Sequence, residues 1–171
     1  NDRSSLRPVI SKARERITLK PYGIYVTPED SPMTNEKYTG FHNAVDFEIL
    51  PGELSQDIPF YAFCGGTITE KRFGRGYGGV LVQNCLLNKQ AVRVLYGHIS
   101  LDSVSKNIGD YLSPGETIGT LGDNESAETD GERKHLHFSI YKGPGTDIRG
   151  YVKTEKELSL WIDPQIYLQG L

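Results

Sequence analysis

Four histidines are the side chains of this sequence best suited to chemistry, and two of them stand close together. His135 and His137 flank a leucine in the run Lys-His-Leu-His-Phe-Ser that begins at residue 134. Side chains alternate along a strand, so both imidazoles and Ser139 would share one face, while Leu136 and Phe138 would share the other. Two imidazoles about 7 Å apart on one strand can address one small site, although an exposed strand face also tolerates such a pair.

His42 precedes Asp46 by four residues in the run Phe-His-Asn-Ala-Val-Asp. An imidazole and a carboxylate are both suitable zinc ligands, and three protein ligands with one open position are typical of a catalytic zinc site. The other interpretation is a loop histidine ahead of a strand, with Asp46 at a turn or sheet edge. These residues alone favour neither interpretation.

His98 ends a run that is predicted to be a strand, in which alternation places Val92, Val94, Tyr96 and His98 on one face. Taken alone, such a histidine is more typical of a hydrogen-bonded structural residue. The order along the chain changes this balance. His-x-x-x-Asp is followed by Tyr-Gly-His and then by His-x-His, all within a glycine-rich sequence with many short β-like runs.

These three motifs resemble, in the same order, the signatures of the lysostaphin-type (LytM-like) metallopeptidases that act on peptidoglycan. The rest of the sequence is also similar to that family in four runs, which are Phe60 to Ile68, Gly76 to Gly79, Pro114 to Gly122 and Trp161 to Leu168. The resemblance extends over residues 40 to 168. It implies a mainly β fold, an antiparallel β-sheet domain with a groove over the sheet and few short helices.

The resemblance assigns one Zn²⁺ per chain to His42, Asp46 and His137, and leaves His98 and His135 free beside it as catalytic residues. No His-Glu-x-x-His segment supplies a glutamate base. The two free histidines therefore inherit the movement of protons and the stabilisation of the oxyanion. The sequence does not decide which of them acts as the base.

Two departures from the family pattern concern the surroundings of the site. Ala44 stands where the family usually has glycine, so we expect the turn to persist with less freedom. An acidic segment at residues 123–134 replaces a short loop of small residues, and it affects the prediction of substrate rather than of metal. Tyr96, predicted to lie beside His98, is a candidate for substrate contact, although packing is the more typical role of such an aromatic residue.

Arg133 is the second candidate for substrate contact, because alternation places it on the face of the two strand histidines. A guanidinium binds carboxylates through two parallel hydrogen bonds. Peptides built on diaminopimelate carry free carboxylates and oligoglycine bridges carry none, so a D-alanyl-diaminopimelate bond is the predicted target. Alternatively, Arg133 pairs with Glu128, Asp130 or Glu132 and only orders the acidic loop.

Two other classes compete with the interpretation as a peptidase. Some lysostaphin-like domains resemble this fold but have lost zinc ligands and regulate other cell-wall hydrolases; retention of every ligand here argues against that class. Cupin-type metal proteins also use His-x-His, but they place a glutamate about four residues after the second histidine, where this chain has Tyr141.

The composition of the chain limits the classes of partner that it could bind. The chain has 171 residues, a net charge of −3 and 37% hydrophobic residues, which fits one domain with a core and no basic excess for nucleic acid. No apolar run is long enough to cross a membrane, and the first twenty residues lack an apolar signal core. Because peptidoglycan lies outside the cytoplasm, we expect a periplasmic or secreted location. The oligomeric state stays open.

Short runs rich in β-branched and aromatic residues predict eight strands. They are Ile24 to Thr27, Ala44 to Ile49, Pro59 to Phe63, Gly66 to Glu70, Gly79 to Asn84, Ala91 to His98, Thr117 to Leu121 and His135 to Tyr141. Helical pieces are predicted at Ser5 to Arg16, at Leu101 to Lys106, after a capping box of Thr154 with Glu157, and after Asp163. Residues 1–39 are expected to form a segment packed on or leading into a peptidase domain at residues 40–171.

Two remaining features of the sequence concern the turns. The glycine-rich run at residues 73–79 lacks the Lys-Ser/Thr of a phosphate loop, so we interpret it as a hairpin connection. Cys64 and Cys85 lack the spacing of a zinc pair and are expected to be small core residues. One disulfide becomes possible if the strands beside them form a hairpin.

Overall fold

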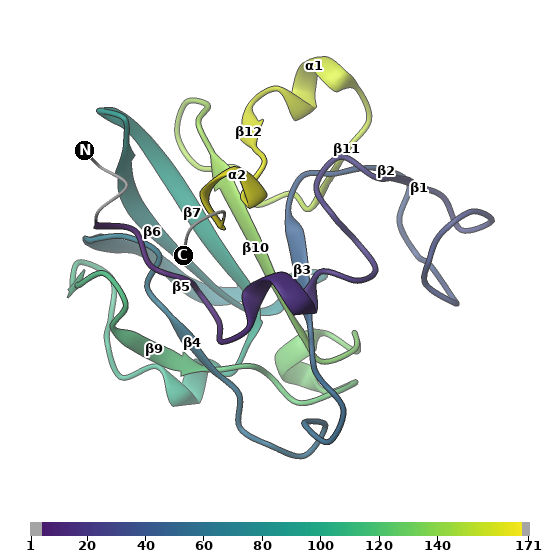
Figure 1. Ribbon diagram of the computed structural model, residues 1–171, viewed down its shortest axis with the longest axis horizontal. Helices are drawn as coiled ribbons and strands as arrows, with labels where there is room; N and C mark the ends of the chain where they lie inside the picture. Colours follow the sequence, from purple (N-terminus) through teal and green to yellow (C-terminus); the bar gives the residue numbers. More distant parts are fainter. Residues whose placement is uncertain (1–4, 169–171) are drawn as a thin grey trace.

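A seven-stranded antiparallel sheet forms the centre of the protein in the computed structural model, which describes residues 5–168 (Figure 1). Its path runs β12-β10-β7-β6-β5-β8, and β3 pairs with the same edge of β10 as β12 does, but nearer the start of β10. The bounds are β3 Val45–Glu48, β5 Gly66–Gly74, β6 Gly78–Leu87, β7 Gln90–Ile99, β8 Tyr111–Leu112, β10 His135–Tyr141 and β12 Trp161–Ile162.

Two smaller sheets accompany the central one. The first has the order β1-β2-β11, with β1 Tyr25–Val26, β2 Gly40–His42 and β11 Tyr151–Val152, and lies beside the start of β3 (Figure 1). The second pairs β4 Pro59–Tyr61 with β9 Thr117–Thr120. All eight predicted strands are present, while β2, β8, β11 and β12 were not predicted. Each unpredicted strand has only two or three residues, too few to show an alternating pattern.

Strand β10 is buried on both faces, for two different reasons. Leu136, Phe138 and Ile140 are fully buried and belong to the main hydrophobic core. His135 and His137 are also buried, at 2% and 3% exposure, but lie on the opposite face. The predicted alternation is therefore confirmed, and it separates a packed face from a polar one.

The N-terminal segment differs from the helix predicted at Ser5 to Arg16. Within residues 6–16 the chain forms a single 3-10 turn, η2 at Ala13–Arg16, instead of a continuous helix. The backbone before it is hydrogen-bonded to β4 and its neighbour, from Arg7 N–H to the Phe63 carbonyl at 2.9 Å and from Tyr61 N–H to the Val9 carbonyl at 2.8 Å. Pro8 disfavours a helix because it removes a donor and restricts the preceding residue to an extended conformation. The helix prediction was wrong for these reasons.

The other short helices lie mostly near the predicted places. Three of them, η3 Leu101–Ser103, α1 Glu155–Leu158 and α2 Gln165–Leu168, correspond to predicted helices, whereas η4 Ala127–Thr129 was not predicted. The predicted capping box of Thr154 and Glu157 opens α1, and the Asp163 carboxylate accepts a hydrogen bond from the Gln165 N–H at 2.9 Å. Within residues 5–168, no helix is long and apolar enough to cross a membrane.

The hairpin of β5 and β6 confirms the interpretation of the glycine-rich run, because residues 75–77 form its turn. Cys64, just before β5, and Cys85, on β6, form a disulfide with α-carbons 5.9 Å apart. The condition that the sequence set for this bridge, a hairpin between the flanking strands, is met.

The segment before residue 40 makes backbone contacts with the sheets, since β1 pairs with β2 and the Lys20 carbonyl accepts a hydrogen bond from Asp46 N–H at 3.1 Å. The ends of the two predicted units, residues 1–4 and 169–171, lie outside the described part of the chain.

Candidate metal centre and active site

Three predicted ligands meet where β2, β3 and β10 come together. His137 is the register partner of Asp46 in the β3-β10 pair, so their side chains share a face. His42 ends β2, and a short turn leads from it into β3. Their exposures are 0% for His42, 2% for Asp46 and 3% for His137, and one potential ligand atom from each lies within 4.8 Å of the others.

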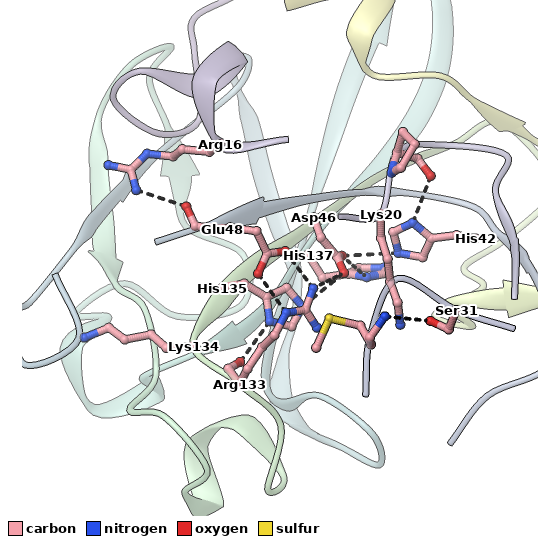
Figure 2. Close-up of polar contacts among 12 residues, drawn as sticks. Arg16, Lys20, Ser31, His42, Asp46, Glu48, Arg133, Lys134, His135 and His137 are labelled. Atoms are coloured by element: carbon pink, nitrogen blue, oxygen red, sulfur yellow. Dashed lines mark hydrogen bonds and ion pairs between the residues drawn. The ribbon is translucent and has the colours of Figure 1, made fainter. Parts of the chain in front are cut away.

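Asp46 Oδ1 is the centre of this cluster. It lies 3.2 Å from His42 Nε2 and 3.3 Å from His137 Nδ1 (Figure 2). The other nitrogen of His42, Nδ1, faces the Pro21 carbonyl at 3.3 Å. A carbonyl only accepts, so Nδ1 carries a proton, and in the neutral ring, the form that binds a metal, Nε2 presents a lone pair toward Asp46.

This arrangement leaves two buried acceptors facing each other. His42 Nε2 and Asp46 Oδ1 have no hydrogen-bond partner among the described residues. Two acceptors 3.2 Å apart cannot satisfy each other, and unpaired buried polar atoms are costly. A cation held by both atoms and by His137 Nδ1 would remove that cost. The residues therefore fit a divalent metal bound by two imidazole nitrogens and one carboxylate oxygen.

The second oxygen of Asp46 is held from the protein side. Asp46 Oδ2 lies 3.0 Å from Arg133 Nη2 and 3.3 Å from His135 Nε2. Burial acts to raise the pKa of Asp46, but the positive charge that His42 and His135 carry in their protonated forms outweighs it and holds that pKa well below its usual range. Burial also lowers the pKa of His137 to about 4. Both ligands are therefore deprotonated at neutral pH, as metal binding requires.

His98 reaches the same site through an irregularity in β7. Gly97 pairs with Val80 and Ile99 pairs with Gly79, so His98 is an extra residue in a β-bulge, with φ of 62°. The bulge turns its ring toward the strand histidines, at a centroid distance of 4.2 Å from His135. Burial and its histidine neighbours lower the pKa of His98 well below its usual value.

The same bulge overturns the prediction that Tyr96 shares a face with His98. Tyr96 is fully buried in the core, where its hydroxyl donates to Gln83 Oε1 at 2.8 Å and accepts from the Phe63 N–H at 2.9 Å. Strand alternation assumes an uninterrupted ladder, and the bulge breaks it one residue after Gly97. Tyr96 is therefore a packing residue of the core, which is the alternative role that the sequence suggested for it.

A pocket of about 200 Å³ opens onto this site and is lined by His98, His135 and His137 among others. A larger cavity of about 480 Å³ lies by the N-terminal segment and Leu168, but its lining includes no histidine and only one carboxylate. The smaller pocket is therefore the one that is lined by the candidate metal-binding and catalytic residues.

The family model for peptidase family M23 matches residues 40–149, which include all four histidines and Asp46. The chain belongs to peptidase family M23. None of the curated proteins matches the sequence.

Solved structures show the same fold at low identity. The catalytic domain of the antimicrobial peptidase lysostaphin from Staphylococcus simulans is 22% identical over 93% of this chain and 98% of that chain, with a TM-score of 0.57. LytU is 23% identical over 90% of this chain and 84% of that chain, with a TM-score of 0.61. A chain from the SpoIIIAH and SpoIIQ complex is 18% identical over 94% and 97%, with a TM-score of 0.60. The predicted LytM-type fold is confirmed.

Arg133 has partners that the sequence did not indicate. Its Nε and Nη2 bind the two carboxylate oxygens of Glu48 at 2.7 and 2.6 Å, and Nη2 also reaches Asp46 (Figure 2). Glu48 is the register partner of His135 across the β3-β10 pair. The structure assigns Arg133 no ion pair with the acidic loop, so that alternative was wrong; the guanidinium lines the pocket while bridging two residues of β3.

Sequence reasoning missed a wall of the pocket that lies outside the M23 match. Lys20 Nζ lies 2.6 Å from Glu36 Oε2 and donates a hydrogen bond to the Tyr151 hydroxyl at 2.7 Å. The rings of Tyr151 and Tyr38 stack, with their centroids 4.7 Å apart. Because these residues are far apart in sequence, no local spacing connects them.

Tyr77 is a second missed residue, and for it a local signal existed. It lies in the turn between β5 and β6 and packs on the rings of His98 and His137, at centroid distances of 5.5 and 4.9 Å. The Gly-Tyr-Gly sequence predicted the turn. It did not show that the turn folds back onto the metal centre.

Proposed function

We propose that this M23 protein is a zinc-dependent endopeptidase that hydrolyses peptide cross-links or stems of bacterial peptidoglycan. The observation that carries the proposal is the pair of buried, unpartnered acceptors His42 Nε2 and Asp46 Oδ1 beside His137 Nδ1. Three such ligands leave one of four tetrahedral positions open for water or substrate, as in catalytic zinc sites.

Zinc bound there would polarise the scissile carbonyl and make water nucleophilic at neutral pH. Beside it, His98 is neutral at that pH, and its Nδ1 is buried without a hydrogen-bond partner in the described residues. A neutral imidazole with a free nitrogen can accept a proton, so we assign the general base to His98.

His135 is arranged in the opposite way. Its Nδ1 faces the Arg133 carbonyl at 2.8 Å and its Nε2 faces Asp46 Oδ2 at 3.3 Å, and both oxygens can only accept. An imidazole with two acceptors around it is set up as a donor, so we assign to His135 proton donation to the leaving amine or the developing oxyanion.

The first test uses zinc content and peptidoglycan clearing together. His42→Ala, Asp46→Ala and His137→Ala should each empty or greatly weaken the site, and should abolish clearing of a peptidoglycan suspension. Tyr141→Phe, a buried change at the other end of β10, should leave both unchanged. Stoichiometric zinc in all three ligand variants would sink the assignment.

The charge of the pocket supports a substrate that carries carboxylates. Four cationic residues line it against two acidic ones, namely Lys20, Arg75, Arg133 and Arg149 against Asp46 and Glu132. Arg133 is already bound to Glu48 and Asp46, whereas the exposed Arg75 has no ion pair with any described residue. We therefore assign recognition of a substrate carboxylate chiefly to Arg75, and the predicted target remains the D-alanyl-diaminopimelate bond.

Purified cross-linked diaminopimelate muropeptides and pentaglycine separate the two substrate classes. We expect preferential cleavage of the muropeptides, and a raised KM for them in Arg75→Ala. Arg72→Ala is the matched control, because Arg72 lies on the same hairpin but pairs with Glu70 and does not line the pocket. Preference for pentaglycine would reject the substrate class, and an unchanged KM in Arg75→Ala would reject the role of Arg75.

The Cys64–Cys85 disulfide supports a periplasmic or secreted location, because disulfides persist in oxidising compartments and are rare in the cytosol. The alternative function is that of a non-catalytic regulator, since a chain of the SpoIIIAH and SpoIIQ complex shares the fold. The complete ligand set favours the enzyme. Failure of the zinc-loaded protein to clear peptidoglycan would favour the regulator.

A further inference from the structure

Tyr77 lies on the side of the His137 ring away from Asp46. Its hydroxyl is 3.3 Å from His137 Nε2, while Nδ1 of the same ring is 3.3 Å from Asp46 Oδ1. The two aromatic rings meet edge to face, with an angle of 63° between their planes. Both nitrogens of this one ligand therefore have a defined neighbour, one toward the metal position and one toward Tyr77.

A narrow slot fixes the position of Tyr77, which is only 6% exposed. A β-carbon at Gly97 would lie 2.7 Å from Tyr77 Cδ1, and one at Gly150 would lie 2.9 Å from the Tyr77 hydroxyl. The Tyr77 N–H also donates to the Gly74 carbonyl at 2.9 Å within the hairpin turn. Two glycines and a hydrogen-bonded turn thus leave room for this ring against His137.

We propose that Tyr77 is a positioning residue of the metal centre, whose hydroxyl holds His137 Nε2 and thereby aims Nδ1 at the metal. A hydroxyl both donates and accepts, so it can pair with Nε2 in either tautomer of the ring. When Nδ1 offers its lone pair to a cation, the proton of the neutral ring resides on Nε2. The Tyr77 oxygen then accepts a hydrogen bond from this Nε2–H group. Partners of this kind fix the orientation of a ligand histidine and raise its basicity.

The inference rests on the proposed zinc site, and it is tested on zinc affinity rather than on activity. Tyr77→Phe keeps the ring but removes the hydroxyl, and we expect zinc affinity to fall about 10- to 100-fold, the range for such partners. Competition with a chromophoric chelator measures the dissociation constant. Tyr141→Phe is the control, because it removes another buried hydroxyl, one that donates to the Pro144 carbonyl away from the site.

Gly150→Ala provides a second variant that retains the hydroxyl. The added methyl group would lie 2.9 Å from the Tyr77 hydroxyl and 3.2 Å from His137 Cε1, so it should displace the contact and also weaken zinc binding. Long-range ¹H–¹⁵N spectra of the zinc-loaded wild type should show His137 protonated on Nε2, with that signal shifted in Tyr77→Phe. Thermal unfolding of the metal-free variants measures any change in the fold itself.

The outcomes separate the two proposals. Wild-type zinc affinity in Tyr77→Phe, with zinc still bound by the wild type, would overturn the role of Tyr77 alone. Equal weakening in Tyr77→Phe and Tyr141→Phe would also overturn it, because the effect would then belong to any buried hydroxyl. No zinc binding by the wild type would overturn the proposed function and this inference with it.

Discussion

Two buried polar clusters at opposite ends of β3 differ in whether their atoms have partners. Arg16 is 1% exposed, and its guanidinium donates to Glu53, to the Ser11 carbonyl and to the Glu48 carbonyl, so each nitrogen has an acceptor. At the other end, His42 Nε2 and Asp46 Oδ1 face each other without one. Figure 2 shows Arg16 beside Glu48 and, farther along the same strand, Asp46 with His42.

The comparison teaches how to distinguish a structural cluster from a binding site in this fold. A buried charge with complete hydrogen bonding belongs to the fold, and removing its partner should affect stability. A buried site with facing acceptors is costly until something binds there. The two clusters should therefore respond to opposite experiments, and each prediction below tests one side of that division.

The largest expected effect is on turnover, in the variants His98→Ala and His135→Ala. Neither residue is among the three assigned ligands, so both variants should keep zinc while the rate falls about 10²- to 10⁴-fold, the range for acid-base groups. Peptide hydrolysis and zinc content are measured on the same samples. Near-normal turnover in both would remove these histidines from the chemistry, and zinc loss in both would make them ligands.

The next effect is on stability, at the satisfied cluster. Glu53→Ala leaves the buried Arg16 guanidinium without its carboxylate, which should lower the free energy of unfolding by about 3–5 kcal/mol. Glu116→Ala, which breaks the more exposed pair with Lys106, should cost only about 0–1 kcal/mol. Urea unfolding measures both. A change in zinc affinity in Glu53→Ala would contradict the separation of the two clusters.

A smaller effect concerns pH. The hydrogen bond from Arg16 holds the pKa of Glu53 below its ordinary value. A carboxyl whose pKa is lower in the folded state stabilises the protein above its unfolded pKa and loses that contribution as the pH falls through the folded value. The stability advantage of wild type over Glu53→Ala should therefore shrink on acidification from about pH 7 to about pH 3. Parallel stability curves would contradict this role of Glu53.

The sequence predicted those parts of the site that depend on local pattern. Alternation placed His135 and His137 on one face of β10, and the family motifs brought His42 and Asp46 into the same cluster. Prediction from the sequence failed where the partner of a residue is distant along the chain or where a strand is irregular. The bulge at His98 places this residue on the face opposite Tyr96, and nothing in Tyr-Gly-His reveals the left-handed residue that causes it.

Long-range pairs explain the remaining differences. Glu48 binds Arg133 from 85 positions earlier in the chain, and Lys20 contacts Tyr151 across 131 positions. No spacing rule connects such residues before the sheets assemble. The N-terminal segment was misassigned for a similar reason, since its backbone partners lie in and beside β4 rather than within the segment.

The central claim is that His42, Asp46 and His137 hold one zinc through the atoms that the fold leaves without partners. X-ray absorption at the zinc edge of the loaded protein measures this coordination directly. The account predicts one zinc per chain with two imidazole nitrogens at about 2.0–2.1 Å, oxygen at about 2.0–2.2 Å and no sulfur. A first shell with a single imidazole, a spectrum unchanged between wild type and His42→Ala, or zinc that does not bind stoichiometrically would contradict it.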